Sequence, residues 1–260
     1  MSAYAECLPW IASPPPRRAV ESNKIEGGIR AESTTAMLWL LISLFFWWML
    51  FREIWSHRVG LPGYDGPDPT PISKTYVAIL LALALLFAWP PLHRWRMEHF
   101  LSGKATQLAD LHRAKVHCNT IFDTLFDSQY LAAGHASPET GQIVFQYPWC
   151  STLMNYLDHP DRASEDELAS LNLLTHESMH VRGEHNEAKT ECEAVQRDYR
   201  AAKLLGVPDS IARKNALDYY RNIYMLKGKV GGIQAEYFSV ECAPGRALDE
   251  HLPDSTWTSN

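Results

Sequence analysis

Residues 164–192 read SEDELASLNLLTHESMHVRGEHNEAKTEC, and this stretch predicts two consecutive helices. Ser164 and, three residues later, Glu167 form a capping box ahead of an apolar run, which is typical of a helix start. The first helix is expected to end at Gly183, because glycine is common just beyond a helix C-terminus. Asn186 can cap the second helix by accepting a backbone hydrogen bond. The stretch therefore predicts a helical hairpin with a short turn.

The first of these helices contains His176-Glu177-Ser178-Met179-His180. Residues four apart lie on one face of a helix, so His176 and His180 can present two imidazoles to one ion. Glu177 flanks the same face and can accept a proton from water held there. This pattern predicts a Zn²⁺ site in which Glu177 is the general base of a hydrolytic reaction. The alternative is a surface helix whose histidines and glutamate are only solvated.

A third zinc ligand is expected from the second helix, where Glu187 and Glu191 share one face. By helical rise, an ion between the two histidines is level with about residue 190, which favours Glu191. Glu187 is then expected to orient an imidazole or to cap the helix, and the reverse assignment stays open. Asn186 is a poor zinc ligand. Candidates for stabilising an oxyanion are Tyr199, Tyr219, Tyr220, Tyr224, Tyr237 and His185.

The cysteines are dispersed along the chain, and none forms a Cys-x-x-Cys pair that would favour a thiolate zinc site. Cys7 lies in the N-terminal tail. The other four are Cys118, Cys150, Cys192 and Cys242. Their even number predicts two disulfides in an oxidising compartment. The alternative is four buried free thiols, which behave as small apolar side chains.

Two long apolar runs precede the hairpin. Residues 1–34, with a proline run and scattered charges, are predicted to be a flexible tail, and Met37 is an alternative start of the chain. Residues 36–51 and 75–92 contain no charge and approach the length needed to cross a bilayer. They predict a two-helix transmembrane anchor over residues 35–97, with a buried core hairpin as the alternative.

Two spans would leave the tail and residues 98–260 on the same side of the membrane. Lysine and arginine are nearly balanced around the spans, so the positive-inside rule selects neither orientation. The cysteines favour the extracytoplasmic side. No cluster of basic residues is present and the net charge is -6, so nucleic acid is not an expected partner.

Residues 98–260 are expected to form one domain that is mainly α with a small β element. The expected elements are a helical region over 104–130, a strand at 143–147, helices at 151–157, 164–182, 186–205 and 210–226, and an extended end over 245–260.

The run Leu174 to Gly183, followed by Asn186-Glu187-Ala188 and Thr190-Glu191-Cys192, resembles bacterial membrane-associated proteins that have a zincin-like, gluzincin-like core. The end of the chain, Glu241 to Gly245 with Leu248-Asp249, is similar to the closing segment of those proteins, and Cys118 and Cys150 have counterparts there. The resemblance covers about residues 110–256. It implies a zincin-like helical metallopeptidase domain in a bacterial cell membrane.

The expected function is therefore that of a membrane-anchored zinc metallopeptidase. Its expected partners are the lipid bilayer and a peptide or protein substrate, while the oligomeric state and the substrate's identity stay open. One alternative is an inactive zincin-like scaffold at the membrane. Another is a zinc hydrolase of non-peptide bonds, which the same ligands could serve.

Overall fold

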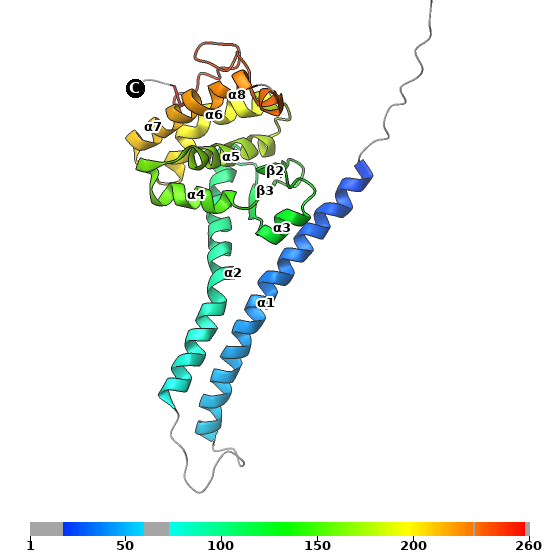
Figure 1. Ribbon diagram of the computed structural model, residues 1–260, viewed down its shortest axis with the longest axis vertical. Coiled ribbons are helices and arrows are strands. Elements are labelled where there is room, and N and C mark those ends of the chain that lie inside the picture. Colours follow the sequence, from blue (N-terminus) through cyan, green and yellow to red (C-terminus); the bar gives the residue numbers. More distant parts are fainter. Residues whose placement is uncertain (1–17, 60–72, 231, 258–260) are drawn as a thin grey trace, which may run out of the picture.

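The computed structural model describes residues 18–59, 73–230 and 232–257. Its first two helices, α1 (Arg18–Val59) and α2 (Lys74–Leu108), form a long antiparallel hairpin below a compact helical domain (Figure 1). The two helices touch along apolar faces, with the Phe87 ring 5.6 Å from that of Phe46. Both helices are long and apolar enough to cross a membrane. The expectation of two helices with the length and composition of membrane spans is confirmed.

The boundaries of the hairpin differ from the expected ones. Helix α1 begins at Arg18, so residues 18–34 of the expected flexible tail are helical, while residues 1–17 lie outside the described part of the chain. Pro90 and Pro91 lie inside α2 and do not end it. The helix instead continues to Leu108, because its last turns carry fully buried side chains into the domain. The expected boundary between anchor and domain, at residue 97, therefore falls within a continuous helix.

Helix α2 also supplies hydrogen-bond partners to the first strand, β1 (Lys115–Cys118). The backbone N–H of Val116 donates to Ser102 Oγ at 2.8 Å, and that of Cys118 donates to Glu98 Oε1 at 2.9 Å. The N–H of Ala114 donates to Thr106 Oγ1 at 3.0 Å in the same way. Four residues of helix rise about 6 Å and two residues of strand about 6.7 Å, so the two spacings nearly match. Side chains on one face of α2 thus accept hydrogen bonds from backbone N–H groups at the β1 edge of the sheet.

The sheet has three short strands in the order β1-β3-β2. Strand β3 (Gln142–Phe145) pairs in parallel with β1 and antiparallel with β2 (Gly134–Ser137). The strand predicted at 143–147 is confirmed within two residues. The helical region predicted over 104–130 is wrong, because Asp110 and Leu111 adopt positive φ values of 52° and 71° and end α2. Between β1 and residue 130, where the predicted helical region ends, the chain forms one short helix, α3 (Ile121–Phe126).

The remaining helices make up most of the domain, and the mainly α class with a small sheet is confirmed (Figure 1). They are α4 (Trp149–Asp158), the 3₁₀ turn η1 (Pro160–Arg162), α5 (Glu165–Arg182), α6 (Glu187–Leu204), α7 (Asp209–Tyr219), the π turn η2 (Tyr220–Tyr224), α8 (Met225–Val230) and the 3₁₀ turn η3 (Gly232–Tyr237). Helix α5 lies between α4 on one side and the layer of α6, α7 and α8 on the other (Figure 1). The helix predicted over 210–226 is confirmed as one continuous helical run, in which the π turn η2 lies between α7 and α8.

Both expected disulfides are present, as Cys118–Cys150 and Cys192–Cys242. The first joins β1 to α4. The second joins α6 to the C-terminal segment, which packs along α6 and does not form the extended end predicted over 245–260. Gln196 holds this segment by donating to the Leu248 carbonyl at 2.9 Å. The segment therefore belongs to the domain.

Replacing Ser102 with alanine tests the junction between α2 and β1. The change leaves the buried Val116 N–H without its partner, so we expect the free energy of unfolding to fall by about 1–3 kcal/mol. Chemical denaturation of the full chain in detergent measures it. Ser151→Ala is the matched control, because Ser151 is exposed and its hydroxyl bonds only to the Pro148 carbonyl. An equal, small effect of both changes would contradict a stabilising role for Ser102.

Candidate metal centre

The turn between α5 and α6 sets the geometry of the site. Helix α5 starts at the predicted capping box of Ser164 and ends at Gly183, whose φ is 113°. The N–H groups of Gly183 and Glu184 bond back to the carbonyls of His180 and Met179, which is a Schellman ending. The Asn186 side chain then accepts from the Lys189 N–H and caps α6. The predicted bounds and caps of both helices are confirmed.

This turn brings the first residue of α6, Glu187, against the two histidines of α5. His176 Nε2 lies 3.1 Å from His180 Nε2 and 3.2 Å from Glu187 Oε2. His180 Nε2 lies 3.5 Å from the same oxygen. Two ligands at zinc–nitrogen or zinc–oxygen distance on a tetrahedral ion are about 3.3 Å apart. The three atoms therefore form a triangle of the size that a tetrahedral metal ion requires.

The other ring nitrogen of each histidine faces an acceptor. His176 Nδ1 lies 2.8 Å from Glu191 Oε2, and His180 Nδ1 lies 2.8 Å from the Glu184 carbonyl oxygen. A carboxylate and a carbonyl can only accept, so Nδ1 carries the proton in both rings. In a neutral imidazole this leaves the Nε2 lone pair free. The two Nε2 atoms and the carboxylate of Glu187 then lie close enough together that they could hold a metal ion.

The positions of Glu187 and Glu191 are the reverse of the preferred prediction. Glu191 does not reach the Nε2 side of the histidines, and both its oxygens have other partners. Its Oε2 accepts from His176, while its Oε1 lies 2.6 Å from Lys227 Nζ and 2.8 Å from the Tyr219 hydroxyl. Glu191 is thus a support for His176 and Glu187 faces the candidate ion, which is the assignment that the sequence left open. Lys227 was not predicted, and no sequence signal marks it.

The support extends deeper into the domain. The Tyr219 hydroxyl lies 2.7 Å from Asn172 Oδ1, and the Asn172 amide nitrogen donates to Asp198 at 3.1 Å. All of these side chains except Lys227 are buried. Burial raises the pKa of Asp198 well above its usual value. This chain of contacts fixes the Glu191 carboxylate, and through it the ring of His176.

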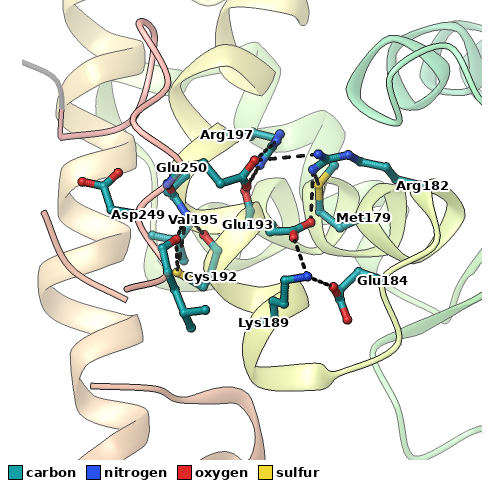
Figure 2. A network of polar contacts seen from close by, with 12 residues as sticks. Met179, Arg182, Glu184, Lys189, Cys192, Glu193, Val195, Arg197, Asp249 and Glu250 are labelled. Atoms are coloured by element: carbon teal, nitrogen blue, oxygen red, sulfur yellow. Dashed lines mark hydrogen bonds and ion pairs between the residues drawn. The ribbon is translucent and has the colours of Figure 1, made fainter. Parts of the chain in front are cut away.

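A second polar network links the end of α5 and the turn to α6 and the C-terminal segment (Figure 2). Lys189 bonds to the Glu184 carboxylate and lies 3.6 Å from Glu193. Glu193 also pairs with Arg182 at 3.1 Å. The buried Arg197 joins this group to the C-terminal segment through two bonds to Glu250, at 2.6 and 2.8 Å. Because Glu184 supplies the acceptor for His180, this network holds the second imidazole in place.

Glu177 lies beside the triangle and is buried between α5 and the sheet. Its Oε1 is 3.5 Å from where a Cβ would stand on Gly134 of β2, which is an ordinary contact, while the same Cβ would lie 2.9 Å from the Val144 carbonyl oxygen, so the strand pairing is what requires glycine there. Its Oε2 is buried and has no hydrogen-bond partner among the described residues. Burial raises the pKa of Glu177, although the nearby imidazoles of His176 and His180 partly offset this. A buried carboxylate with a free oxygen and a raised pKa is suited to proton transfer.

The carboxylates and imidazoles around the triangle shift each other's pKa values. Burial alone would lower the pKa of His176, but the adjoining carboxylates of Glu187 and Glu191 outweigh it and raise that pKa to about 10. The two imidazoles hold the pKa of Glu187 at about 2. Glu187 is therefore ionised at neutral pH, and the site attracts positive charge.

Among the candidate oxyanion-stabilising side chains, Tyr237 lies next to the site, and its ring centroid is also 5.5 Å from Lys227 Nζ. The ring of Tyr237, at the end of η3, is 5.7 Å from that of His176. His185 is exposed in the turn, and Tyr219 supports Glu191. The remaining hydroxyls bond elsewhere: Tyr199 to Asp209, Tyr220 to the Cys242 carbonyl and Tyr224 to the Ser239 carbonyl.

Comparison of the chain with models of protein families, with curated proteins and with solved structures finds no match. The resemblance to zincin-like proteins therefore stays a hypothesis that rests on the motif.

The roles of the two glutamates can be separated by metal titration. We expect Glu191→Ala to weaken zinc binding about 10–100-fold, as loss of a group that orients a ligand does. Glu187→Ala removes a carboxylate that faces the ion directly and should weaken binding further. Competition with a chromogenic chelator measures both affinities. A larger loss in Glu191→Ala than in Glu187→Ala would restore the original assignment.

Proposed function

We propose that the chain is a membrane-anchored zinc metallopeptidase in which His176, His180 and Glu187 hold Zn²⁺. The observation that carries this proposal is the triangle of three ligand atoms 3.1–3.5 Å apart, with both Nδ1 atoms committed to acceptors. Zinc in hydrolases has three protein ligands of this kind and an open fourth position. When bound, it supplies a Lewis acid that lowers the pKa of water and polarises a carbonyl group.

The charge of the site supports a dication. The carboxylates of Glu177, Glu187 and Glu191 and the ammonium of Lys227 lie around the imidazoles of His176 and His180, and a metal ion at the two Nε2 atoms would take the place of the proton that the raised pKa of His176 favours. With the three carboxylates ionised and both imidazoles neutral, this group has a net charge of -2, by addition of three negative charges and one positive charge. A buried surplus of negative charge is unfavourable. A doubly charged ion neutralises it, whereas a single proton does not.

The side chains around the site then have separate roles in hydrolysis. The free oxygen of Glu177 takes a proton from the attacking water, and the same carboxyl group later delivers it to the leaving amine. Tyr237, beside His176, is the candidate donor to the developing oxyanion. Glu191, held by Lys227, keeps His176 in the tautomer that leaves Nε2 free.

The sheet favours an extended peptide as the substrate. Strand β2 is an edge strand, because β3 pairs with it on one side and no other described strand pairs with it. Its first residue, Gly134, lies against Glu177. A peptide that adds to such an edge through backbone hydrogen bonds would lie close to the general base. This placement supports peptide bonds over other zinc-hydrolase substrates.

The free oxygen of Glu177 also argues against an inactive scaffold. A structural metal site requires the ligands but has no use for a buried carboxylate whose Oε2 has no hydrogen-bond partner among the described residues. For the anchor, α1 and α2 have the length and composition of membrane helices. Two disulfides favour an extracytoplasmic position of the domain.

Replacing Glu177 with glutamine separates catalysis from metal binding. The change removes the base while leaving the ligands, so we expect peptide cleavage to fall about 10²–10⁴-fold with zinc content unchanged. The assay is digestion of an unbiased peptide library by the full chain in detergent, with zinc measured by elemental analysis. His176→Ala is the control and should lose both zinc and cleavage.

Two results would contradict this proposal in different ways. A purified chain that binds no zinc, with wild-type and His176→Ala protein alike, would refute the metal site. A chain that binds zinc, cleaves no peptide and hydrolyses an ester or amide probe in a manner dependent on Glu177 would point to a zinc hydrolase of non-peptide bonds.

Alkylation of cysteines in intact cells tests the side of the membrane. Cys118, Cys150, Cys192 and Cys242 are expected to react only after reduction, because all four are disulfide-bonded in an oxidising compartment. Mass spectrometry of the alkylated chain measures this. Reaction of these four thiols without a reductant would refute the extracytoplasmic placement.

A further inference from the structure

An exposed apolar surface lies on the short helix α3 and the segments next to it. This α3 surface consists of Ile121, Phe122, Leu125, Phe126, Tyr130, Leu131 and Tyr147, all of which are exposed. Phe126 and Leu131 are 85% and 86% exposed, more than any other large apolar side chain described. So many exposed large apolar side chains within one short stretch are uncommon on proteins surrounded by water, and groups of this kind mark contact sites.

Packing in the core does not explain why α3 carries these residues. None of its six residues is buried. The helix is held at its start by a capping box, in which Thr120 and Asp123 bond to each other's backbone N–H groups. The second acidic residue nearby, Asp127, is engaged by Asn119 and Gln146. The polar groups thus support the backbone, while the apolar side chains face outward.

The position of α3 indicates what covers this surface. Helix α3 lies on the side of the domain from which the hairpin extends, beside α1, while α6, α7 and α8 lie at the opposite side (Figure 1). The hairpin itself exposes apolar side chains such as Leu86 and Trp89 over its outer faces. Two tyrosines, Tyr130 and Tyr147, belong to the α3 surface, and tyrosine is favoured where a membrane meets water.

We propose that the α3 surface docks onto the lipid bilayer, as a membrane contact separate from the two spanning helices. Aliphatic and aromatic side chains then enter the interface between headgroups and acyl chains, as in other interfacial anchors. The continuity with the apolar hairpin favours lipid over a protein partner. A second copy of the chain or the chain's own residues 1–17 are the other occupants that the experiment must separate.

This docking has a consequence for the candidate site, which rests on the proposed peptidase function. The segment that follows α3 leads directly into β2, where Gly134 lies against Glu177. Contact of the α3 surface with lipid therefore holds the β2 edge near the bilayer. The substrate class that this arrangement selects is a polypeptide segment lying close to the membrane surface.

Photocrosslinking of the full chain in nanodiscs of phosphatidylcholine and phosphatidylglycerol tests the docking. A photoreactive phenylalanine analogue is placed at Phe126 or Leu131, at Leu86 of α2, and at Val240. Leu86 is 62% exposed and reports on the hairpin; Val240 is 72% exposed and lies outside both surfaces. We expect lipid adducts by mass spectrometry at Phe126, Leu131 and Leu86, at several times the yield at Val240.

The controls separate the proposals. If Leu86 gives lipid adducts but Phe126 and Leu131 give no higher yield than Val240, the docking of α3 is overturned. The hairpin anchor is then left intact. Crosslinks from Phe126 or Leu131 to a second copy, or to residues 1–17, overturn it in favour of that occupant. Absence of lipid adducts at Leu86 refutes the anchor itself, and with it the docking.

A double variant, Phe126→Ser with Leu131→Ser, tests the consequence for substrate. Its zinc content and its cleavage of a soluble peptide should be unchanged, while cleavage of the same peptide linked to a lipid should fall at least several-fold. An equal rate on the lipid-linked peptide would overturn the substrate class. Failure of the wild-type chain to cleave either peptide would instead count against the peptidase function.

Discussion

The left-handed turn at Gly183 is the constraint on which the candidate centre depends. Its φ of 113° is a conformation that strains any residue with a side chain, although nothing lies within 4 Å of the place where a Cβ would be. Glycine is thus required here by the backbone and not by crowding. The turn directs the Glu184 carbonyl at His180 and starts α6 at Glu187. A turn of another length would move Glu187 away from the histidines.

Local patterns were enough to predict the helical half of the site. The capping box at Ser164, the end at Gly183 and the cap at Asn186 are signals within a few residues of the atoms they position, and each is present. Nearby residues do not indicate which of Glu187 and Glu191 faces the two Nε2 atoms. It is decided by Tyr219 and Lys227, which lie 28 and 36 residues from Glu191 in the chain. The strand β1 was missed for the same reason, since its edge is satisfied by side chains of α2.

The electrostatics of the centre follow from this distant support. Glu191 is buried, and an unpaired carboxylate there would be costly. The ammonium of Lys227 offsets its charge, so Glu191 can hold the His176 proton without drawing it away from the ring. No lysine or arginine among the described residues offsets Glu187 in the same way: its Oε2 faces the two Nε2 atoms, at 3.2 and 3.5 Å. The fold thus neutralises the carboxylate that orients a ligand and leaves charged the one that faces the proposed ion.

Helix α2 connects the hairpin to this centre through rigid elements. Its side chains Glu98, Ser102 and Thr106 hold the edge of β1, and β1 pairs with β3, which pairs with β2. No flexible linker lies between α2 and the sheet, because β1 begins seven residues after α2 ends and is bonded back to it. If α2 crosses the membrane as proposed, the height and tilt of the β2 edge above the bilayer are set by the helix itself. This rigid connection alone would then let the proposed peptidase select substrates by their distance from the membrane.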